Sequence, residues 1–284
     1  MKVIVCAGGT GGHIYPAVAI INKIKEKNPS CKILYIGTTD RMEKDIIPKL
    51  GIDYKGIEMK GINRKNIFKN IEVLIDYRKA IKKAHSIIKD FQPDIVIGVG
   101  GYITAPVISA AHKLKVKTLI HEQNSIPGVT NRISARYVDR ICISLPGSKE
   151  YFPKDKVVYT GNPRSEEIIK AKALSKKHFG LDKEKKLVVI VMGSLGSTTM
   201  MNKIKKLIPA FKGKNYQVLI ISGNNYYDQY KCEHLPSNVK VVPFLNEFIN
   251  LLKSTDIVIS RAGASTISEI TAIGVPAILV PSPY

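Results

Sequence analysis

A run of glycines that ends in a histidine is the stretch of this chain best suited to chemistry. Residues 8–13, Gly-Gly-Thr-Gly-Gly-His, lie between the apolar run 3–5 and a helix-like pattern that starts near Ile14. Glycines let the backbone approach a ligand closely, and the helix offers free N–H groups and the positive end of its dipole. The pattern favours a phosphate-binding turn in which His13 is a candidate general base. The alternative is a tight turn with a capping histidine.

The same order of apolar run, small residues and helix occurs three more times, at 98–101, 193–196 and 263. A single turn of this kind is weak evidence, whereas two in each half indicate a site for a substrate with a diphosphate. Residues 121–125, His-Glu-Gln-Asn-Ser, follow a further apolar run. Open α/β sheets bind their ligands at the carboxyl ends of strands, so we also expect a site there.

Apolar runs alternate with helical patterns along the whole chain, which predicts an α/β fold with parallel sheets. Turn residues at 160–164 interrupt the alternation. We therefore expect two Rossmann-like domains, residues 1–160 and 161–284. The last apolar run, 277–280, has no helix after it to cover it, so we expect the second domain to be incomplete at its C-terminus.

The composition limits the classes of protein to which the chain can belong. With 284 residues and 44% hydrophobic side chains, it is long enough for two domains with a core each. No apolar run of about 18 residues and no signal-peptide pattern occurs, so we expect a cytoplasmic protein. The four cysteines lack metal-ligand spacing and no Asp-x-Asp pair occurs. We therefore expect reduced thiols, no metal and no cofactor.

The formal net charge of +21 favours polyanionic partners, and the excess is concentrated between Lys60 and Lys89. Apolar side chains are interleaved with the basic ones in this segment, at Ile67, Phe68, Ile71, Leu74 and Ile75. A basic amphipathic segment of this kind can lie on an anionic membrane surface. An ordinary packed helix with a solvated lysine face explains the pattern equally well.

Several motifs together resemble the MurG family: residues 8–13, 100–102, 121–124, 161–163 and 261–269. The resemblance extends in order from Val3 to Tyr284. It implies a GT-B fold, with two Rossmann-like domains that face a cleft. It also implies that the enzyme moves N-acetylglucosamine from UDP-N-acetylglucosamine to lipid I, undecaprenyl-diphosphoryl-N-acetylmuramoyl pentapeptide. The product is lipid II for peptidoglycan synthesis. The first domain would bind the acceptor and the membrane, and the second the donor.

The resemblance also implies which residues bind each substrate. Glu269 would hold the ribose, and backbone groups of Phe244 and Leu245 would bind the uracil edge. The residues implied for the donor are Thr10, Gly11, Gly12, Asn124, Arg164, Ser194, Phe244, Leu245, Gly263, Ala264, Ser265, Thr266 and Glu269. The acceptor's diphosphate is expected at Gly11, Gly12, Gly100, Gly101 and Tyr102. Without the family, Glu269 would pass for a solvated helix acid and Ser194 for a helix cap.

The family inverts the anomeric centre, which requires a base at the C4 hydroxyl of the muramoyl sugar. His13 is the first candidate, and Glu122 and His121 are the alternates. The chain departs from the family at residues 162–165, Asn-Pro-Arg-Ser in place of Asn-Pro-Val-Arg, so that Arg164 or Ser165 stands for the family's arginine. The family's sugar-binding glutamine pair would lie beyond residue 284.

Three other classes of protein remain as alternatives. Another UDP-sugar transferase of the GT-B fold would have the same loops. A nicotinamide-dependent oxidoreductase would have one such loop, but Ile14 stands where its third glycine is needed. A nucleic-acid-binding protein would match the charge, but no motif of that class occurs, so we expect no nucleic acid partner.

Overall fold

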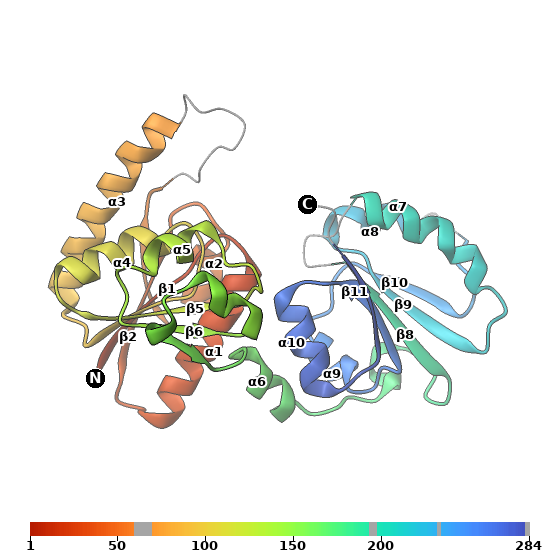
Figure 1. The fold of residues 1–284 in the computed structure, drawn as a ribbon. Coiled ribbons are helices and arrows are strands. Elements are labelled where there is room, and N and C mark those ends of the chain that lie inside the picture. The colour runs from red at the N-terminus through yellow and green to blue at the C-terminus, as the bar shows by residue number, and fades with distance from the viewer. Residues whose placement is uncertain (60–69, 193–197, 232–233, 282–284) are drawn as a thin grey trace. The chain divides into compact units, whose positions relative to one another are not determined.

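The computed structural model describes residues 1–59, 70–192, 198–231 and 234–281, and the chain divides into two compact units, Met1–Pro163 and Arg164–Tyr284 (Figure 1). Each unit contains one parallel β-sheet with helices on both of its faces. The expectation of an α/β fold with two Rossmann-like parallel-sheet domains is therefore confirmed. The division lies between Pro163 and Arg164, whereas the turn residues in the sequence suggested a boundary after residue 160.

The sheet of the first unit has the strand order β3-β2-β1-β4-β5-β6-β7, and all neighbouring pairs are parallel. Its strands are β1 (Lys2–Cys6), β2 (Lys32–Thr38), β3 (Asp53–Ile57), β4 (Ile95–Gly98), β5 (Lys117–Glu122), β6 (Arg140–Ile143) and β7 (Val157–Tyr159). The strand order reverses between β1 and β4. The loops after these two strands therefore flank the point at which open α/β sheets bind ligands.

Alternating side chains along the strands of the first unit pack against helices on opposite faces of the sheet. Val3 and Val5 belong to the core under α1 and α2, whereas Ile4 and Cys6 belong to the core under α3 and α4. Figure 1 shows α3, α4 and α5 together on one face. The helices are α1 (Gly11–Lys27), α2 (Glu43–Lys49), α3 (Asn70–Phe91), α4 (Thr104–Lys113) and α5 (Val129–Ser134), and Pro146–Tyr151 and Lys154–Lys156 form short 3-10 turns.

The second unit has the strand order β10-β9-β8-β11-β12, again with all neighbouring pairs parallel. Its strands are β8 (Lys186–Val191), β9 (Tyr216–Ile221), β10 (Val239–Val242), β11 (Ile257–Arg261) and β12 (Ala277–Val280). Its helices are α6 (Arg164–Lys170), α7 (Thr198–Leu207), α8 (Asn224–Lys231), α9 (Phe248–Leu252) and α10 (Ala264–Ile273), with 3-10 turns at Lys176–Phe179 and Ile208–Phe211. Residues of α9 and α10 belong to the core on one face of this sheet, and residues of α7 and α8 to the core on the other.

The structure differs from the sequence-based expectation at a few elements. The first helix begins at Gly11, inside the glycine run, and not near Ile14. Helices α5, α6 and α8 were not expected, because they are short and polar and carry no continuous apolar stripe.

Of the described cysteines, Cys6 and Cys31 are buried and Cys142 is half-buried, and all three are free thiols. Among the described residues, no helix combines the length and the apolar character needed to cross a bilayer.

Candidate active site

The glycine loops after β1 and β4 lie directly against each other. The backbone N–H of Gly8 donates to the carbonyl of Gly100, with 3.3 Å between nitrogen and oxygen. Gly101 has a φ of +82°, and a Cβ on it would collide with the Gly8 backbone. A Cβ on Gly100 would collide with the imidazole of His13. The glycines thus allow two loops and one histidine ring to pack where any side chain would separate them.

His13 lies at this junction, with one ring nitrogen engaged. Its Nδ1 is 3.2 Å from the carbonyl oxygen of Gly8. Because a carbonyl oxygen only accepts hydrogen bonds, Nδ1 carries the proton and Nε2 keeps its lone pair. Among the described residues, no hydrogen bond reaches Nε2. Burial lowers the pKa of His13 below 6.5, and the bond to Gly8 and the charges of Glu122 and Glu43 oppose this only in part. The ring is therefore neutral at pH 7, as a base requires.

His121, by contrast, uses both of its ring nitrogens within the fold. Its side chain is 2% exposed. Its Nε2 lies 3.1 Å from the carbonyl of Gly161, and its Nδ1 lies 3.1 Å from the amide nitrogen of Gln123. The Gln123 amide also donates to the carbonyl of Val99, at the end of β4. His121 and Gln123 thus connect the carboxyl ends of β4 and β5 to the segment before α6.

Glu122 is also fully engaged. The residue is 1% exposed, and its carboxylate accepts four hydrogen bonds. One oxygen accepts from the backbone and side-chain nitrogens of Asn124, both at 2.9 Å. The other accepts from the backbone of Gly128 and the amide of Asn131. Asn124, expected to bind the donor, is exposed but holds this carboxylate. Of the three candidate bases, only His13 presents an acceptor without a partner among the described residues.

The residues expected to bind the acceptor's diphosphate lie around the same junction. Thr10, which was expected to bind the donor, precedes them as the N-cap of α1, and its carbonyl accepts from His13 and Ile14. Gly11 and Gly12 form the first turn of this helix, whose N–H groups have no intrahelical acceptor. The Tyr102 hydroxyl accepts from Nε of Arg41, at 3.3 Å. The sequence analysis did not identify Arg41, although it closely follows the strand end at Thr38, a position that could have pointed to it.

In the second unit, Glu269 and Arg164 form an ion pair. Nη2 of Arg164 lies 3.2 Å from Oε1 of Glu269, and the two side chains are 16% and 11% exposed. Burial raises the pKa of Glu269, and the charge of Arg164 opposes this rise. Arg164 also pairs with Glu167, at 3.6 Å. The pair joins α6 to the second turn of α10, the helix that begins directly after β11 and the Gly263 cap. Sequence analysis expected both residues at the donor but did not anticipate their contact.

The described residues of the second unit that were implied for the donor lie after the carboxyl ends of its strands, whereas Thr10, Gly11, Gly12 and Asn124 belong to the first unit. Ala264, Ser265 and Thr266 form the first turn of α10 and are half-buried. Phe244 and Leu245 follow β10; Phe244 is 51% exposed, whereas Leu245 packs against the core. Ser194 lies outside the described residues. Among the residues that the structure describes, no group of three or more His, Cys, Asp or Glu side chains is arranged to hold a metal ion.

The sequence matches two domain families. Residues 3–143 match the Glycosyltransferase family 28 N-terminal domain, and residues 187–284 match the Glycosyltransferase family 28 C-terminal domain. The chain is thus a glycosyltransferase family 28 protein.

Proteins with a single shared name resemble the chain over its whole length. A Bacillus pumilus protein is 45% identical over 100% of this chain and 79% of its own length, and a Bacillus subtilis protein is 41% identical over 100% and 80%. Both are named UDP-N-acetylglucosamine--N-acetylmuramyl-(pentapeptide) pyrophosphoryl-undecaprenol N-acetylglucosamine transferase. The crystal structure of Acinetobacter baumannii MurG is 28% identical, with a TM-score of 0.74 over 99% of this chain and 79% of that one. The chain belongs to the MurG family.

A more distant structure shares the fold alone. UDP-GlcNAc 2-epimerase from Neisseria meningitidis, bound to UDP-GlcNAc, is 17% identical with a TM-score of 0.68 over 98% of this chain and 82% of that one.

Proposed function

We propose that this chain transfers N-acetylglucosamine from UDP-N-acetylglucosamine to the C4 hydroxyl of the N-acetylmuramoyl sugar of lipid I and so forms lipid II for peptidoglycan synthesis. The observation that carries the proposal is the identity of 41–45% over the whole chain to relatives named for this transfer. In the cell, this step would serve wall growth, and through it cell shape and division.

His13 is the general base in this proposal. The reaction inverts the anomeric carbon in one displacement, so the acceptor hydroxyl must lose its proton as UDP departs. The lone pair on Nε2 of a neutral imidazole suits this step, and the bond from Nδ1 to Gly8 holds the ring in the required tautomer. Neither His121 nor Glu122 offers such an acceptor, because each is buried and hydrogen-bonded within the fold. Their proposed role is to hold the end of β5 in place.

The donor is bound by the second unit. Glu269 accepts hydrogen bonds from the ribose hydroxyls, and the first turn of α10 stabilises the negative charge that develops on the departing diphosphate. Phe244 and Leu245 provide backbone groups for the uracil ring. Arg164 fits the part of the family's arginine near the diphosphate better than Ser165 does. It is a cation that already lies 3.2 Å from Glu269.

The acceptor's diphosphate is bound by the first unit, at the N-terminus of α1 and the loop after β4. Gly11, Gly12, Gly100 and Gly101 let the phosphates reach backbone N–H groups, and the next residue, Tyr102, binds the guanidinium of Arg41 through its hydroxyl. This site requires no metal ion, since backbone amides and a cation supply the positive charge.

The transfer can be tested with purified protein. The chain is incubated with a lipid I analogue and either UDP-N-acetylglucosamine or UDP-glucose, and the products are identified by mass spectrometry. We expect a disaccharide product and released UDP with the first donor alone. Transfer from UDP-glucose would instead favour a GT-B enzyme with another sugar specificity. Binding of NADH, followed by its fluorescence, would favour an oxidoreductase.

The first unit also contacts the cytoplasmic face of the membrane as a peripheral protein, in this proposal through the segment Lys60–Lys89. On α3, Arg78, Lys79, Lys82 and Lys83 are exposed, and Ile75 is 50% exposed. Ile67 and Phe68 lie outside the described residues. Each cation near anionic lipid contributes about 1 kcal/mol, and salt screens this attraction.

Vesicle sedimentation tests the membrane face. The double variant Lys79→Glu, Lys82→Glu should pellet less than the parent with anionic vesicles, and neither should pellet with neutral ones. Lys212→Glu, Lys214→Glu makes the same charge change at exposed positions of the second unit and is the matched control. Equal loss in both double variants would show that net charge alone, and not α3, determines binding.

A further inference from the structure

The carboxylate of Glu43 lies beneath the first glycine loop, where no solvent reaches it. Glu43 is the first residue of α2 and is 0% exposed. Its Oε1 accepts from the backbone nitrogen of Thr38 at 3.1 Å and from the Thr38 hydroxyl at 2.8 Å. Its Oε2 accepts from the backbone nitrogen of Gly9 at 3.2 Å. One buried side chain therefore joins the end of β2 to the loop that follows β1.

The backbone is closely packed around this carboxylate. A Cβ on Gly8 would collide with Oε1 of Glu43, and a Cβ on Gly37 would collide with its Cγ. Gly9 has a φ of +94°, a conformation that L side chains rarely adopt. The glycines at 8, 9 and 37 thus let two strand ends close around one acid, and the loop has little freedom to move away from it.

The peptide unit between Gly8 and Gly9 connects Glu43 to His13. The N–H of this unit, from Gly9, donates to Glu43, and its C=O, from Gly8, accepts from Nδ1 of His13. The two groups are parts of one rigid plane and point in opposite directions, because the peptide bond is planar and trans. The orientation that Glu43 imposes on the N–H therefore also sets the direction of the carbonyl that holds the imidazole.

We propose that Glu43 is a positioning residue for the transfer reaction: it fixes the Gly8–Gly9 peptide plane and thereby orients His13 with Nε2 towards the acceptor. This inference rests on the proposed role of His13 as the base. Glu43 touches no reacting atom, and its contribution passes through one peptide unit. An ionised side chain suits the position because all three of its partners are donors.

The charge of Glu43 acts on His13 as well. The acidic groups that influence His13 are Glu122, at the end of β5, and Glu43. Around Glu43 itself lie the phenols of Tyr35 and Tyr54, from β2 and β3, the guanidinium of Arg41 and the imidazole of His13. Removal of the Glu43 charge should therefore lower the pKa of His13, because an anion nearby favours the protonated ring.

Glu43→Gln removes the contact to the N–H of Gly9 but keeps the volume of the side chain. The amide oxygen is best placed at Thr38, where it meets two donors, so the amide NH₂ faces the N–H of Gly9 and that bond is lost. We expect kcat to fall by about 10- to 100-fold, the scale of a small misplacement of a catalytic group, with the KM for UDP-N-acetylglucosamine unchanged. Asp45→Asn makes the same charge change at an exposed position in the first turn of the same helix and should leave both constants at parent values.

The pKa of His13, measured by NMR with His13→Ala for assignment, provides a readout that does not depend on turnover. It should fall in Glu43→Gln and stay at the parent value in Asp45→Asn.

A folded Glu43→Gln protein with parent kcat and parent His13 pKa would overturn the inference. If that variant does not fold, exchange of the Gly9 amide proton in the parent decides the matter: exchange as fast as in an open loop would show that Glu43 does not hold it. A parent that transfers no sugar, but whose His13 pKa responds to Glu43→Gln, would contradict the proposed function and leave the contact intact.

Discussion

Acidic side chains bind backbone N–H groups at both ends of the strands, but the two ends use them differently. At the carboxyl ends of the first sheet, Glu43 and Glu122 are buried and hold loops in place. At the amino ends of both sheets, aspartates hold one strand to the next. The bonds are chemically alike, but those at the carboxyl ends immobilise loops and those at the amino ends hold neighbouring strands together.

In the part of the chain that the structure describes, the amino-end arrangement occurs three times. Each aspartate immediately precedes a strand, accepts from a backbone N–H at the start of the neighbouring strand, and donates its own N–H to the carbonyl of that same residue. The pairs are Asp94 with Lys2, Asp139 with Thr118, and Asp256 with Leu187, with carboxylate-to-nitrogen distances of 2.7, 2.8 and 2.8 Å. Such a pair sets the register of two parallel strands.

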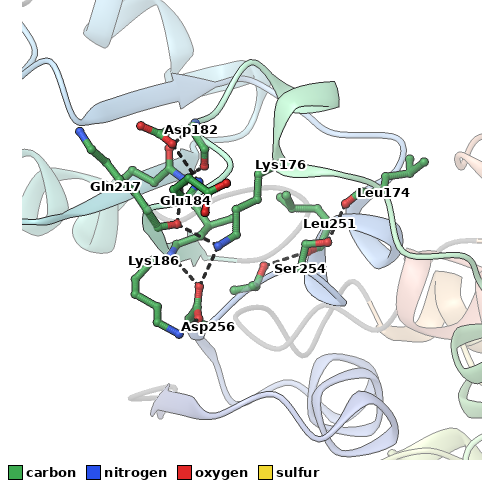
Figure 2. A network of polar contacts seen from close by, with 12 residues as sticks. Leu174, Lys176, Asp182, Glu184, Lys186, Gln217, Leu251, Ser254 and Asp256 are labelled. Atoms are coloured by element: carbon green, nitrogen blue, oxygen red, sulfur yellow. Dashed lines mark hydrogen bonds and ion pairs between the residues drawn. The ribbon is translucent and has the colours of Figure 1, made fainter.

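At Asp256 the arrangement is extended by two lysines. Figure 2 shows its carboxylate between Lys176 and Lys186, which lie 3.1 and 2.9 Å away, close to Gln217 and its partner Asp182. Partial burial disfavours the charge, but the bonds from Lys186, Leu187 and Lys176 outweigh it and lower the pKa of Asp256 to about 2. The carboxyl-end acids instead bind backbone amides of the loops, and among the described residues Nε2 of His13 has no hydrogen-bond partner. The comparison predicts that substitutions at the carboxyl ends of the strands lower catalysis and that substitutions at the amino ends lower stability.

The largest effect is expected from His13→Ala, which should lower kcat by at least ~10²-fold with little change in donor binding or melting temperature. Loss of a base raises the transition state more than the ground state. His112→Ala removes an exposed histidine at the end of α4 and is the control. Turnover of the His13 variant within a few-fold of the parent would mean that another group is the base. The loops at the carboxyl ends would then not act on catalysis through His13.

The pH dependence of kcat should follow the titration of His13. A base must be unprotonated, so activity is complete above its pKa and is lost as the pH falls through it. Because burial lowers this pKa below 6.5, we expect a flat profile through neutral pH and a decline on the acid side. In the His13→Ala variant the residual rate should lack this acid limb. A limb that persists there would report a different titrating group.

Glu269→Ala should weaken UDP binding by about 1.5–3 kcal/mol, the scale of hydrogen bonds to a charged group. Calorimetry with UDP measures it. Glu167→Ala removes a second acidic partner of Arg164 and is the matched control. If both variants lose the same affinity, the effect passes through Arg164 and the ribose assignment is wrong. An unchanged dissociation constant in Glu269→Ala would also contradict it.

The architecture could be predicted from sequence because its signals are local. Apolar runs, glycine turns and helical periods each lie within about 20 residues, and they indicated parallel sheets and the loop positions of the site. The polar helices α6 and α8 escaped prediction because tertiary contacts, and not an apolar stripe, stabilise them.

The roles of individual polar residues could not be predicted, because they depend on distant partners. In the sequence, His13 is the first candidate base, and His121 and Glu122 are its alternates. What distinguishes them is the carbonyl of Gly161, 40 residues from His121, and the amide of Asn131, 9 residues from Glu122. Glu43 binds Gly9 across 34 residues, and no local pattern marks the contact.

The smallest effect on turnover is expected from Asp256→Asn, which should act on stability alone. The amide keeps an acceptor for Leu187 but not the charge that holds Lys176 and Lys186, so the free energy of unfolding should fall by about 2 kcal/mol at pH 7. A lowered pKa means that this contribution is present above 3.8 and is lost as the pH falls towards about 2. In urea unfolding, the free energy of unfolding should therefore be lower for the variant than for the parent at pH 7, and the two values should converge in acid. Glu184→Gln changes an exposed acid nearby and should leave the free energy of unfolding at the parent value. An Asp256→Asn variant with parent stability and reduced kcat would mean that the amino ends of the strands affect catalysis. That result would contradict the distinction between the two ends of the strands.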